Sequence, residues 1–175
     1  CLVILIMLQT AMALKMARKN QLLEQKAYID IHTGLPNKGS CEELLNNREI
    51  LREPTACVIF DLNNLKTVND TRGHSAGDQL ILSFARLLRR VIPEKHFVGR
   101  YGGDEFIIFA DNHTDSDAKE LIDCIYMHIK KFNRISDKPY AIDASIGYII
   151  TKADIDMSLY KVISMADQAM YCLLY

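Results

Sequence analysis

One short connection constrains the fold of this chain more than any other feature. Apolar segments at residues 97–101 and 105–110 are separated only by Gly102, Gly103 and Asp104. A connection this short can join only antiparallel strands, because a parallel crossover needs a dozen or more residues. Glycine pairs are typical of hairpin turns whose central residues need positive φ. The sequence therefore predicts a β-hairpin here and excludes an all-parallel sheet.

Helices and strands alternate on both sides of the predicted hairpin. The apolar run of residues 56–62 and the Ile-rich run of residues 140–150 are typical of buried strands. Ser40, with Glu43 three residues later, resembles a helix N-cap. Helices are predicted over residues 41–50, 75–92, 115–134 and 157–175. This order indicates an α+β fold, in which helices pack on a sheet that contains antiparallel strands.

The N-terminal segment differs in composition from the rest of the chain. Residues 1–14 are apolar except for Gln9 and Thr10, and they are followed by the basic residues Lys15, Arg18 and Lys19. This run is shorter than the roughly 20 residues that span a bilayer. However, the chain begins at Cys1, and basic residues follow the apolar run as they do on the cytoplasmic side of a transmembrane helix. We therefore expect a location at the bacterial cytoplasmic membrane, with the following domain in the cytoplasm. A short helix that packs on a partner is the alternative.

A turn-rich stretch separates this segment from the rest of the chain. Residues 30–39 contain two glycines, a proline and an asparagine, which are typical of turns. We predict two units. Residues 1–29 are the end of a transmembrane helix that continues as a linker or signalling helix, and residues 30–175 are a globular domain.

Charge and cysteine content argue against two classes of function. The formal net charge of the 175 residues is −1, so there is no basic excess to suggest nucleic-acid binding. The five cysteines are scattered and form no CxxC pair, which is typical of reduced thiols rather than of a zinc site.

Two acidic residues are predicted to meet at one edge of the sheet. Asp61 closes the apolar run of residues 56–62, and Asp104 lies in the hairpin turn. A carboxylate beside a dry core is costly unless it is paired or bound to a metal. If the strand that ends at Asp61 lies beside the hairpin, the two carboxylates form a site suited to Mg²⁺ and substrate phosphates. An ordinary hairpin with solvated acids is the alternative.

The loop after Asp61 adds groups that suit a nucleotide. Residues 63–66 place backbone N–H groups and Lys66 near a predicted helix start, an arrangement that binds anions. Asn69 and Asp78 together offer the donors and acceptors that match the edge of guanine. A solvated lysine, a turn asparagine and a helix-capping aspartate are the alternatives for these three side chains.

Five segments in this order resemble the GGDEF domain of diguanylate cyclases. They are DIHTGLPNK (30–38), FDLNNLKTVNDTRGHSAGD (60–78), RYGGDEF (100–106), ASIGY (144–148) and MADQAMY (165–171). The resemblance implies a ferredoxin-like, palm-type sheet flanked by helices and preceded by an N-terminal helix. It also implies a Mg²⁺-dependent reaction that condenses two GTP into cyclic di-GMP and releases pyrophosphate. Each domain of this family holds one GTP, so a homodimer with the site at its interface is implied as well.

The resemblance assigns roles to individual residues. Asp61 and Asp104 would bind Mg²⁺, or Mn²⁺ in its place, together with the backbone carbonyl of Leu62. Glu105 would assist at the metal or with the attacking 3′-hydroxyl. The residues expected to bind GTP are Asn64, Leu65, Lys66, Asn69, Asp78, Gly102 and Gly103.

The sequence departs from the family pattern at several positions. Asn63 stands where Asp is common, His32 stands where Leu is usual, and residues 93–96 replace the RxxD of a product-inhibition site. Leu174 stands where Lys is expected, one residue before the chain ends, and truncation and divergence both account for this ending. A catalytically weakened domain that binds GTP as a regulatory or sensory module is therefore the alternative function. A purely structural dimerisation domain would have no reason to keep the acids.

Overall fold

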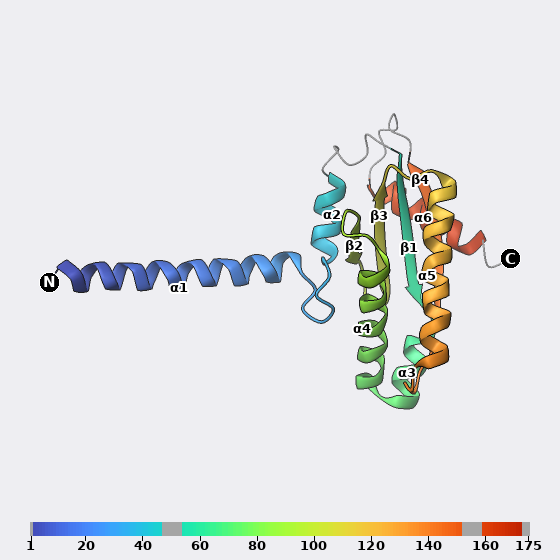
Figure 1. The fold of residues 1–175 in the computed structure, drawn as a ribbon, viewed down its shortest axis with the longest axis horizontal. Helices are drawn as coiled ribbons and strands as arrows, with labels where there is room; N and C mark the ends of the chain where they lie inside the picture. Colours follow the sequence, from blue (N-terminus) through green and yellow to red (C-terminus); the bar gives the residue numbers. More distant parts are fainter. Residues whose placement is uncertain (1, 47–53, 152–158, 173–175) are drawn as a thin grey trace.

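A four-stranded antiparallel sheet forms the centre of the protein. The computed structural model describes residues 2–46, 54–151 and 159–172. Within these ranges the strands follow the order β2-β3-β1-β4 (Figure 1). They are β1 (Thr55–Leu62), β2 (Phe97–Arg100), β3 (Glu105–Asp111) and β4 (Ala144–Thr151). The predicted hairpin is confirmed as β2 and β3.

β1 lies in the middle of the sheet because it is apolar along almost its whole length. All its residues from Thr55 to Phe60 are buried. It pairs with β3 so that Asp61 lies opposite Glu105, and with β4 so that Leu62 lies opposite Ala144. Side chains of directly paired residues point to the same face of a sheet. Asp61 and Glu105 therefore share one face.

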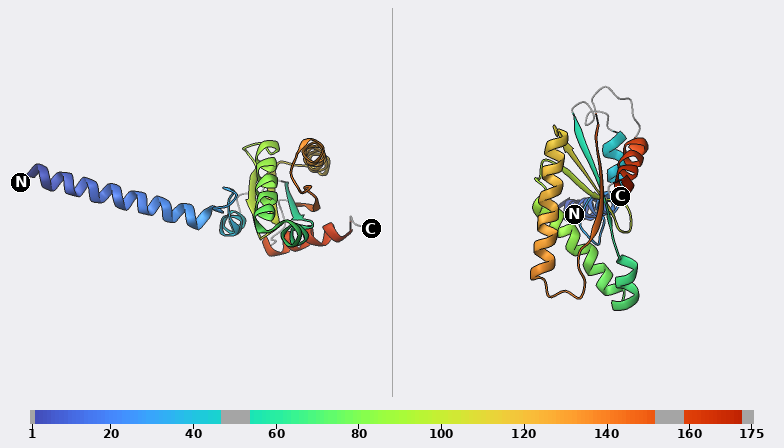
Figure 2. Two further views of the ribbon diagram at one scale, coloured as in Figure 1. Left: turned by 90° about the horizontal axis from the view of Figure 1, so that it is seen from below. Right: turned by 90° about the vertical axis from the view of Figure 1, so that its right-hand side faces the viewer.

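Helices cover both faces of the sheet (Figure 2). α4 (His74–Val91) and α5 (Asp115–Ile135) pack on one face, around a core that includes Phe60, Phe84 and Phe106. α2 (Lys38–Asn46) and α6 (Leu159–Cys172) pack on the other face. α3 (Leu65–Arg72) follows β1 at the end of the sheet. The order β1-α4-β2-β3-α5-β4 is that of the ferredoxin-like fold, so the predicted fold class is confirmed.

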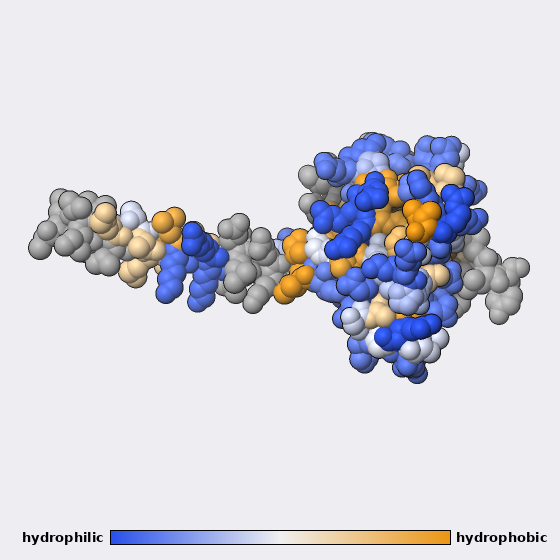
Figure 3. All heavy atoms as spheres, turned by 60° about the horizontal axis from the view of Figure 1, so that its bottom comes forward, coloured by the Kyte–Doolittle hydropathy of each residue, from blue (hydrophilic) through white to orange (hydrophobic). Residues whose placement is uncertain are grey.

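α1 (Leu2–Tyr28) extends away from the sheet and its covering helices as one straight helix (Figure 1). In the part of the chain that the structure describes, no helix combines the length and apolar content that a membrane crossing requires. The predicted location at the cytoplasmic membrane is therefore wrong. The apolar run ends at Leu14, and the charged Lys15 follows on the same helix. Figure 3 shows hydrophilic side chains beside hydrophobic ones along this helix.

Two element boundaries, those of α2 and β4, differ by three or four residues from those predicted. α2 begins at Lys38, and the side chain of Asn37, not of Ser40, acts as a cap: its Oδ1 accepts from the backbone N–H of Ser40 at 3.1 Å. β4 begins at Ala144 rather than at residue 140, because the side-chain amide of Asn133 takes both backbone hydrogen bonds of Ile142. The predictions for residues 47–50, 157–158 and 173–175, Leu174 included, fall outside the described residues.

Candidate active site

The acids that were predicted to meet lie at the same end of the sheet. Asp61 in β1 pairs directly with Glu105, the first residue of β3. The backbone N–H of Leu62 donates to the carbonyl of Asp104 at 3.0 Å, which ties the end of β1 to the hairpin turn. Backbone pairing therefore holds Asp61, Asp104 and Glu105 together, and the predicted approach of the β1 end to the hairpin is confirmed.

The hairpin turn does not have the conformation that its two glycines suggested. Neither Gly102 nor Gly103 has a positive φ. The turn is wider than a two-residue turn, because the backbone N–H groups of Tyr101 and Gly102 both donate to the carbonyl of Glu105, at 2.9 and 3.2 Å. Positive φ is required in tight two-residue hairpin turns. The longer connection between β2 and β3 reverses the chain without a residue of positive φ.

The two glycines serve the turn in different ways. A Cβ on Gly102 would overlap the carboxylate of Glu105. A Cβ on Gly103 would have no heavy atom within 4 Å. Gly102 therefore lets the Glu105 side chain lie close against the turn, whereas Gly103 leaves open space on its exposed side.

Arg100, the last residue of β2, stabilises the hairpin turn through hydrogen bonds of its side chain. Its guanidinium donates to the carbonyls of Gly102 and Gly103 at 3.1 and 2.7 Å. The same group donates to the two carboxylate oxygens of Asp30 at 3.0 and 3.2 Å. The backbone N–H of Arg100 donates to the carbonyl of Pro36 at 2.8 Å. Sequence reasoning missed Arg100 and Asp30, although they are the first residues of the quoted segments 100–106 and 30–38.

A further acid, Asp167 of α6, adds to the charge at this end of the sheet. Burial raises the pKa of Asp61, and the charges of Asp104 and Asp167 raise it further. Burial also raises the pKa of Glu105; Asp104, Asp61 and Asp167 add to this effect, and Lys38 opposes it. The shifts at Asp61 and Glu105 reflect an excess of negative charge at this end of the sheet, which a bound cation would offset. Sequence reasoning missed Asp167, although it lies within the quoted segment of residues 165–171.

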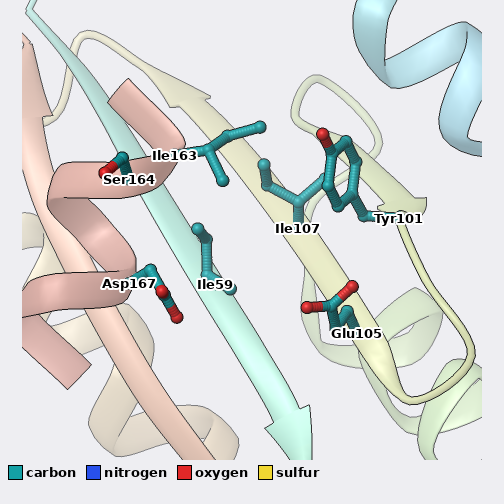
Figure 4. A pocket seen from close by; sticks show the side chains of 7 residues that line it. All are labelled: Ile59, Tyr101, Glu105, Ile107, Ile163, Ser164 and Asp167. Carbon is teal, nitrogen blue, oxygen red and sulfur yellow. The ribbon is translucent and has the colours of Figure 1, made fainter. Parts of the chain in front are cut away.

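A cavity of about 200 Å³ opens beside these acids, on the face of the sheet that α6 covers. Figure 4 shows the carboxylates of Glu105 and Asp167 reaching into it from β3 and from α6, with Ile59 of β1 between them. Small-molecule pockets usually measure about 300–1,000 Å³. This cavity therefore suits a hydrated ion or one part of a ligand, not a whole nucleotide.

The predicted anion-binding loop forms the N-terminus of α3. Asn64 precedes this helix in the left-handed conformation, with φ of 62°, and its carbonyl accepts from the backbone N–H of Val68 at 2.9 Å. The first turn of α3 contains no acidic residue. The first amide groups of α3, including that of Leu65, and the exposed Lys66 therefore present positive potential just beyond the end of β1.

The two residues predicted to recognise guanine lie on neighbouring helices. Asn69 is in α3 and Asp78 is exposed in the first turns of α4, and the chain reverses between them at Gly73, whose φ is 84°. A Cβ on the buried Gly77 would overlap the side-chain amide of Asn69. Gly77 therefore lets Asn69 lie against the start of α4, next to Asp78. Sequence reasoning missed this role of Gly77.

Asn63 links the end of β1 to the start of β4. Its side-chain amide donates to the carboxylate of Asp143 at 3.1 Å and accepts from the hydroxyl of Ser145 at 3.0 Å. Its backbone N–H donates to the carbonyl of Asp143 at 2.9 Å. An aspartate at residue 63 would meet Asp143 with like charge, so the neutral amide suits this place.

The acidic end of the sheet suits a magnesium ion that also binds a ligand. Among the described residues, no three or more His, Cys, Asp or Glu side chains are grouped as a metal site. Mg²⁺, however, is usually held by one or two carboxylates, and water and substrate phosphates complete its coordination. Asp61 and Asp104, beside the amides of α3, match that donor set.

Comparison with known proteins identifies this arrangement. Residues 27–174 match the family model described as diguanylate cyclase, GGDEF domain. The chain belongs to the GGDEF family. Signaling protein YkoW of Bacillus subtilis (strain 168) is 36% identical over 155 residues, which are 85% of this chain and 19% of that protein. Diguanylate cyclase TpbB of Pseudomonas aeruginosa (strain UCBPP-PA14) is 30% identical over 159 residues, which are 87% of this chain and 36% of that protein.

Solved structures support the same assignment. The coiled coil and GGDEF domain of DgcB from Caulobacter crescentus, solved in complex with c-di-GMP, superposes with a TM-score of 0.81 at 26% identity. The match covers 94% of this GGDEF chain and 89% of the DgcB chain. This GGDEF chain spans 19%, 24% and 28% of the length of three curated relatives. The relatives are therefore much longer proteins.

Proposed function

We propose that this GGDEF chain is a diguanylate cyclase, which condenses two GTP molecules into cyclic di-GMP and releases two pyrophosphates. One observation carries the proposal. Asp61, Asp104 and Glu105 meet at one end of the sheet, directly beside the N-terminal amides of α3. Excess negative charge that attracts a cation, next to a helix end that attracts phosphate, suits a metal-bound nucleotide.

Asp61 and Asp104, with the backbone carbonyl of Leu62, would hold Mg²⁺, and Mn²⁺ suits the same oxygen ligands. When bound, the cation offsets the charge of the triphosphate and polarises its α-phosphate. The backbone contact between Leu62 and Asp104 supports this assignment, because it keeps the proposed ligands on two different strands together.

The remaining residues hold the nucleotide in place. The backbone amides of α3 and the charge of Lys66 bind its phosphates, the two polar side chains at the α3–α4 junction bind guanine, and the glycine turn lets the nucleotide approach. The residues proposed for GTP binding are Asn64, Leu65, Lys66, Asn69, Asp78, Gly102 and Gly103.

Glu105 is proposed to take the proton from the attacking 3′-hydroxyl of the second GTP. Its carboxylate lies at the start of β3, directly opposite Asp61, so it is placed beside the proposed metal ligands where this proton is released. As the proton moves to Glu105, the 3′-oxygen bonds to the α-phosphorus and the bond to pyrophosphate breaks. The same step on the facing nucleotide closes the ring.

Two GTP molecules must face one another in this reaction. We therefore propose a homodimer in which each protomer presents its acidic end to its partner. In this proposal residues 30–175 are the GGDEF domain, and residues 1–29 are a linker or signalling helix that sets the distance between the two domains.

A GTP-binding module with weakened turnover is the second candidate. The observation that favours it is Asn63, an amide engaged with Asp143 and Ser145 where the family commonly has an acid. The two candidates share the GTP site and differ only in product formation.

Incubation of the full chain with GTP and Mg²⁺, followed by mass spectrometry of the products, tests the proposal. We expect cyclic di-GMP, and we expect Glu105→Gln to lower its formation at least about 100-fold, since general-base groups typically contribute that much. Asp104→Asn should also lower its formation, because it removes a proposed Mg²⁺ ligand. Glu94→Gln and Asp137→Asn are matched controls, because both residues are exposed and lie outside the site. GTP binding without product would favour the second candidate, and full activity of Glu105→Gln would refute its assigned role.

A further inference from the structure

The solvent-facing side of α5 carries a regular row of side chains. These residues follow one another at spacings of three and four, so they lie on one face of the helix. The row, called the α5 stripe below, consists of Glu120, Asp123, Met127, Lys130 and Arg134. It points directly away from the sheet, because the opposite face of α5 carries the buried Ala118, Ile122, Ile125 and Ile129.

Charge changes sign halfway along the α5 stripe. Two acids precede Met127 and two bases follow it, and Met127 itself is 63% exposed, which is high for an apolar side chain. Within the described ranges, none of the four charged side chains has a hydrogen bond or an ion pair. The stripe therefore presents two opposite charge patches and an apolar centre to solvent.

The helix dipole does not account for this pattern. Its effect on charged side chains falls off within the first and last turns of a helix. Asp123 and Lys130 lie well inside α5, which runs from Asp115 to Ile135. In addition, Lys130 and Arg134 are like charges four residues apart, and Glu120 and Asp123 are like charges three residues apart. Both spacings destabilise an isolated helix.

The α5 stripe is complementary to a second copy of itself. Relative to Met127, the acids lie at positions −7 and −4 and the bases at +3 and +7. If two copies run antiparallel around a twofold axis through Met127, Glu120 meets the partner's Arg134 and Asp123 meets the partner's Lys130. Such an isologous contact repeats every ion pair twice.

We infer that the α5 stripe is a self-association surface, through which two copies of this chain pair antiparallel with Met127 at the twofold axis. The contact involves little more than one helix from each copy. It is therefore smaller than the interfaces of stable complexes and forms weakly, with salt-dependent affinity.

This pairing is distinct from the dimer proposed for catalysis. α5 covers one face of the sheet, whereas Asp61 and Glu105 share the opposite face with Ile59 and Ile107. Two copies joined through α5 therefore hold their acidic sites apart on the outside of the pair. If the proposed cyclase function holds, the two acidic sites within such a pair do not face one another, so this pair is not the productive dimer.

Exchange of the charges tests the surface. Glu120→Lys with Asp123→Lys makes the stripe wholly basic, and Lys130→Glu with Arg134→Glu makes it wholly acidic. We expect sedimentation analysis to show at least about tenfold weaker self-association for each double variant alone, since four ion pairs become repulsive contacts worth about 1.4 kcal/mol or more together. We expect an equimolar mixture of the two variants to form heterodimers, and the quadruple variant to regain wild-type association.

Matched variants separate this contact from other modes of dimerisation. Arg90→Glu with Lys95→Glu changes two exposed charges outside α5 and is expected to leave self-association within about twofold of wild type. A dimer formed through α1 or through the acidic site would respond equally to all variants and would not favour the mixture. The proposal would be overturned if the equimolar mixture of the basic and acidic double variants associates no better than either variant alone, whatever other partner the α5 stripe binds.

A disulfide across the proposed axis is a second test. In a full chain with Cys1, Cys124 and Cys172 replaced by serine, Met127→Cys should form a disulfide-linked dimer under mild oxidation. Glu120→Cys should not, because residues seven positions from the axis lie about 21 Å apart along it in the two copies. Equal cross-linking of both variants would refute the antiparallel register. Both tests measure association, so they stand even if no cyclic di-GMP is formed.

Discussion

Replacement of Arg100 by methionine measures what the Arg100 guanidinium contributes to the stability of the fold. The substitution keeps most of the aliphatic stem and removes the guanidinium. It deletes two hydrogen bonds to the carbonyls of Gly102 and Gly103, and an ion pair with Asp30. The Arg100 and Asp30 side chains are only 14% and 24% exposed, so water replaces these bonds poorly.

The magnitude follows from these contacts. A hydrogen bond to a charged group contributes about 1.5–3 kcal/mol, and a bond to a carbonyl about 0.5–1.5 kcal/mol. With a reduction for partial exposure, we expect Arg100→Met to lower the free energy of unfolding by about 2–4 kcal/mol. For a domain of this size that lowers the Tm by about 4–16 °C.

Urea unfolding followed by circular dichroism measures this loss. Arg90→Met is the matched control, because Arg90 is exposed and has no ion pair among the described residues; its effect should stay within about 0.5 kcal/mol. A double-mutant cycle with Asp30→Asn should give a coupling of about 1–2 kcal/mol. Additive losses of unfolding free energy in the Arg100→Met/Asp30→Asn cycle would refute the proposed role of Arg100. A loss for Arg100→Met as small as that for Arg90→Met would refute it as well.

The dependence on pH provides an independent check. Burial raises the pKa of Asp30, but hydrogen bonds from Thr33 and the contact with Arg100 outweigh it and hold the pKa below its ordinary value. A carboxylate with a lowered pKa contributes stability that is complete above about pH 4 and is lost as the pH falls through the lowered value. The difference in stability between wild type and Arg100→Met should therefore be constant near neutral pH and should narrow below about pH 4.

Three further predictions concern the turn, the acidic cluster and the opposite end of the sheet. Gly102→Ala should lower cyclic di-GMP formation at least about tenfold because its Cβ displaces Glu105. Gly103→Ala, with open space around its Cβ, should fold normally and keep Glu105 in place. Equal effects of the two substitutions on turnover at saturating GTP would contradict this assignment. Asp167→Asn should raise the free energy of unfolding of the metal-free protein by about 0.2–1 kcal/mol, since it removes one of several like charges. This gain in stability should shrink when Mg²⁺ is added. Calorimetry with and without Mg²⁺ measures the two stabilities. His96 is buried with its Nδ1 unpartnered among the described residues, and burial lowers its pKa, so stability should fall as the pH drops below about 6.5. His96→Phe should remove that fall between pH 7.5 and 5.5 in urea unfolding, and an unchanged pH profile would show that His96 is not its source.

The sequence predicted the features that depend on strand order and local chemistry. A hairpin next to an apolar strand that ends in Asp61 was enough to place Asp61 near Asp104. Helix propensity and turn residues gave most element boundaries to within a few residues. The departures arose where a distant side chain replaces a local one, as Asn133 does at the start of β4.

The missed site residues depend on packing between distant segments. Arg100 and Asp30 are 70 positions apart, and no periodicity relates them. Asp167 joins the acids only because α6 packs on the same face of the sheet as Glu105. The membrane prediction took the apolar run of residues 1–14 as the end of a transmembrane helix, but no helix among the described residues is long and apolar enough to cross a membrane.

The central position of β1 determines the order in which this sheet can be completed during synthesis. The β2–β3 hairpin joins residues that are close in the chain, such as Arg100 and Phe106, so it can form early. β1 must wait for both of its neighbours: Asp61 pairs with Glu105, 44 positions later (105 − 61), and Leu62 pairs with Ala144, 82 positions later (144 − 62). Until β4 emerges from the ribosome, one edge of the most apolar strand has no partner. Such an edge is a template for pairing with other chains, so fragments that stop before residue 144 should aggregate even though they contain the complete GGDEF motif.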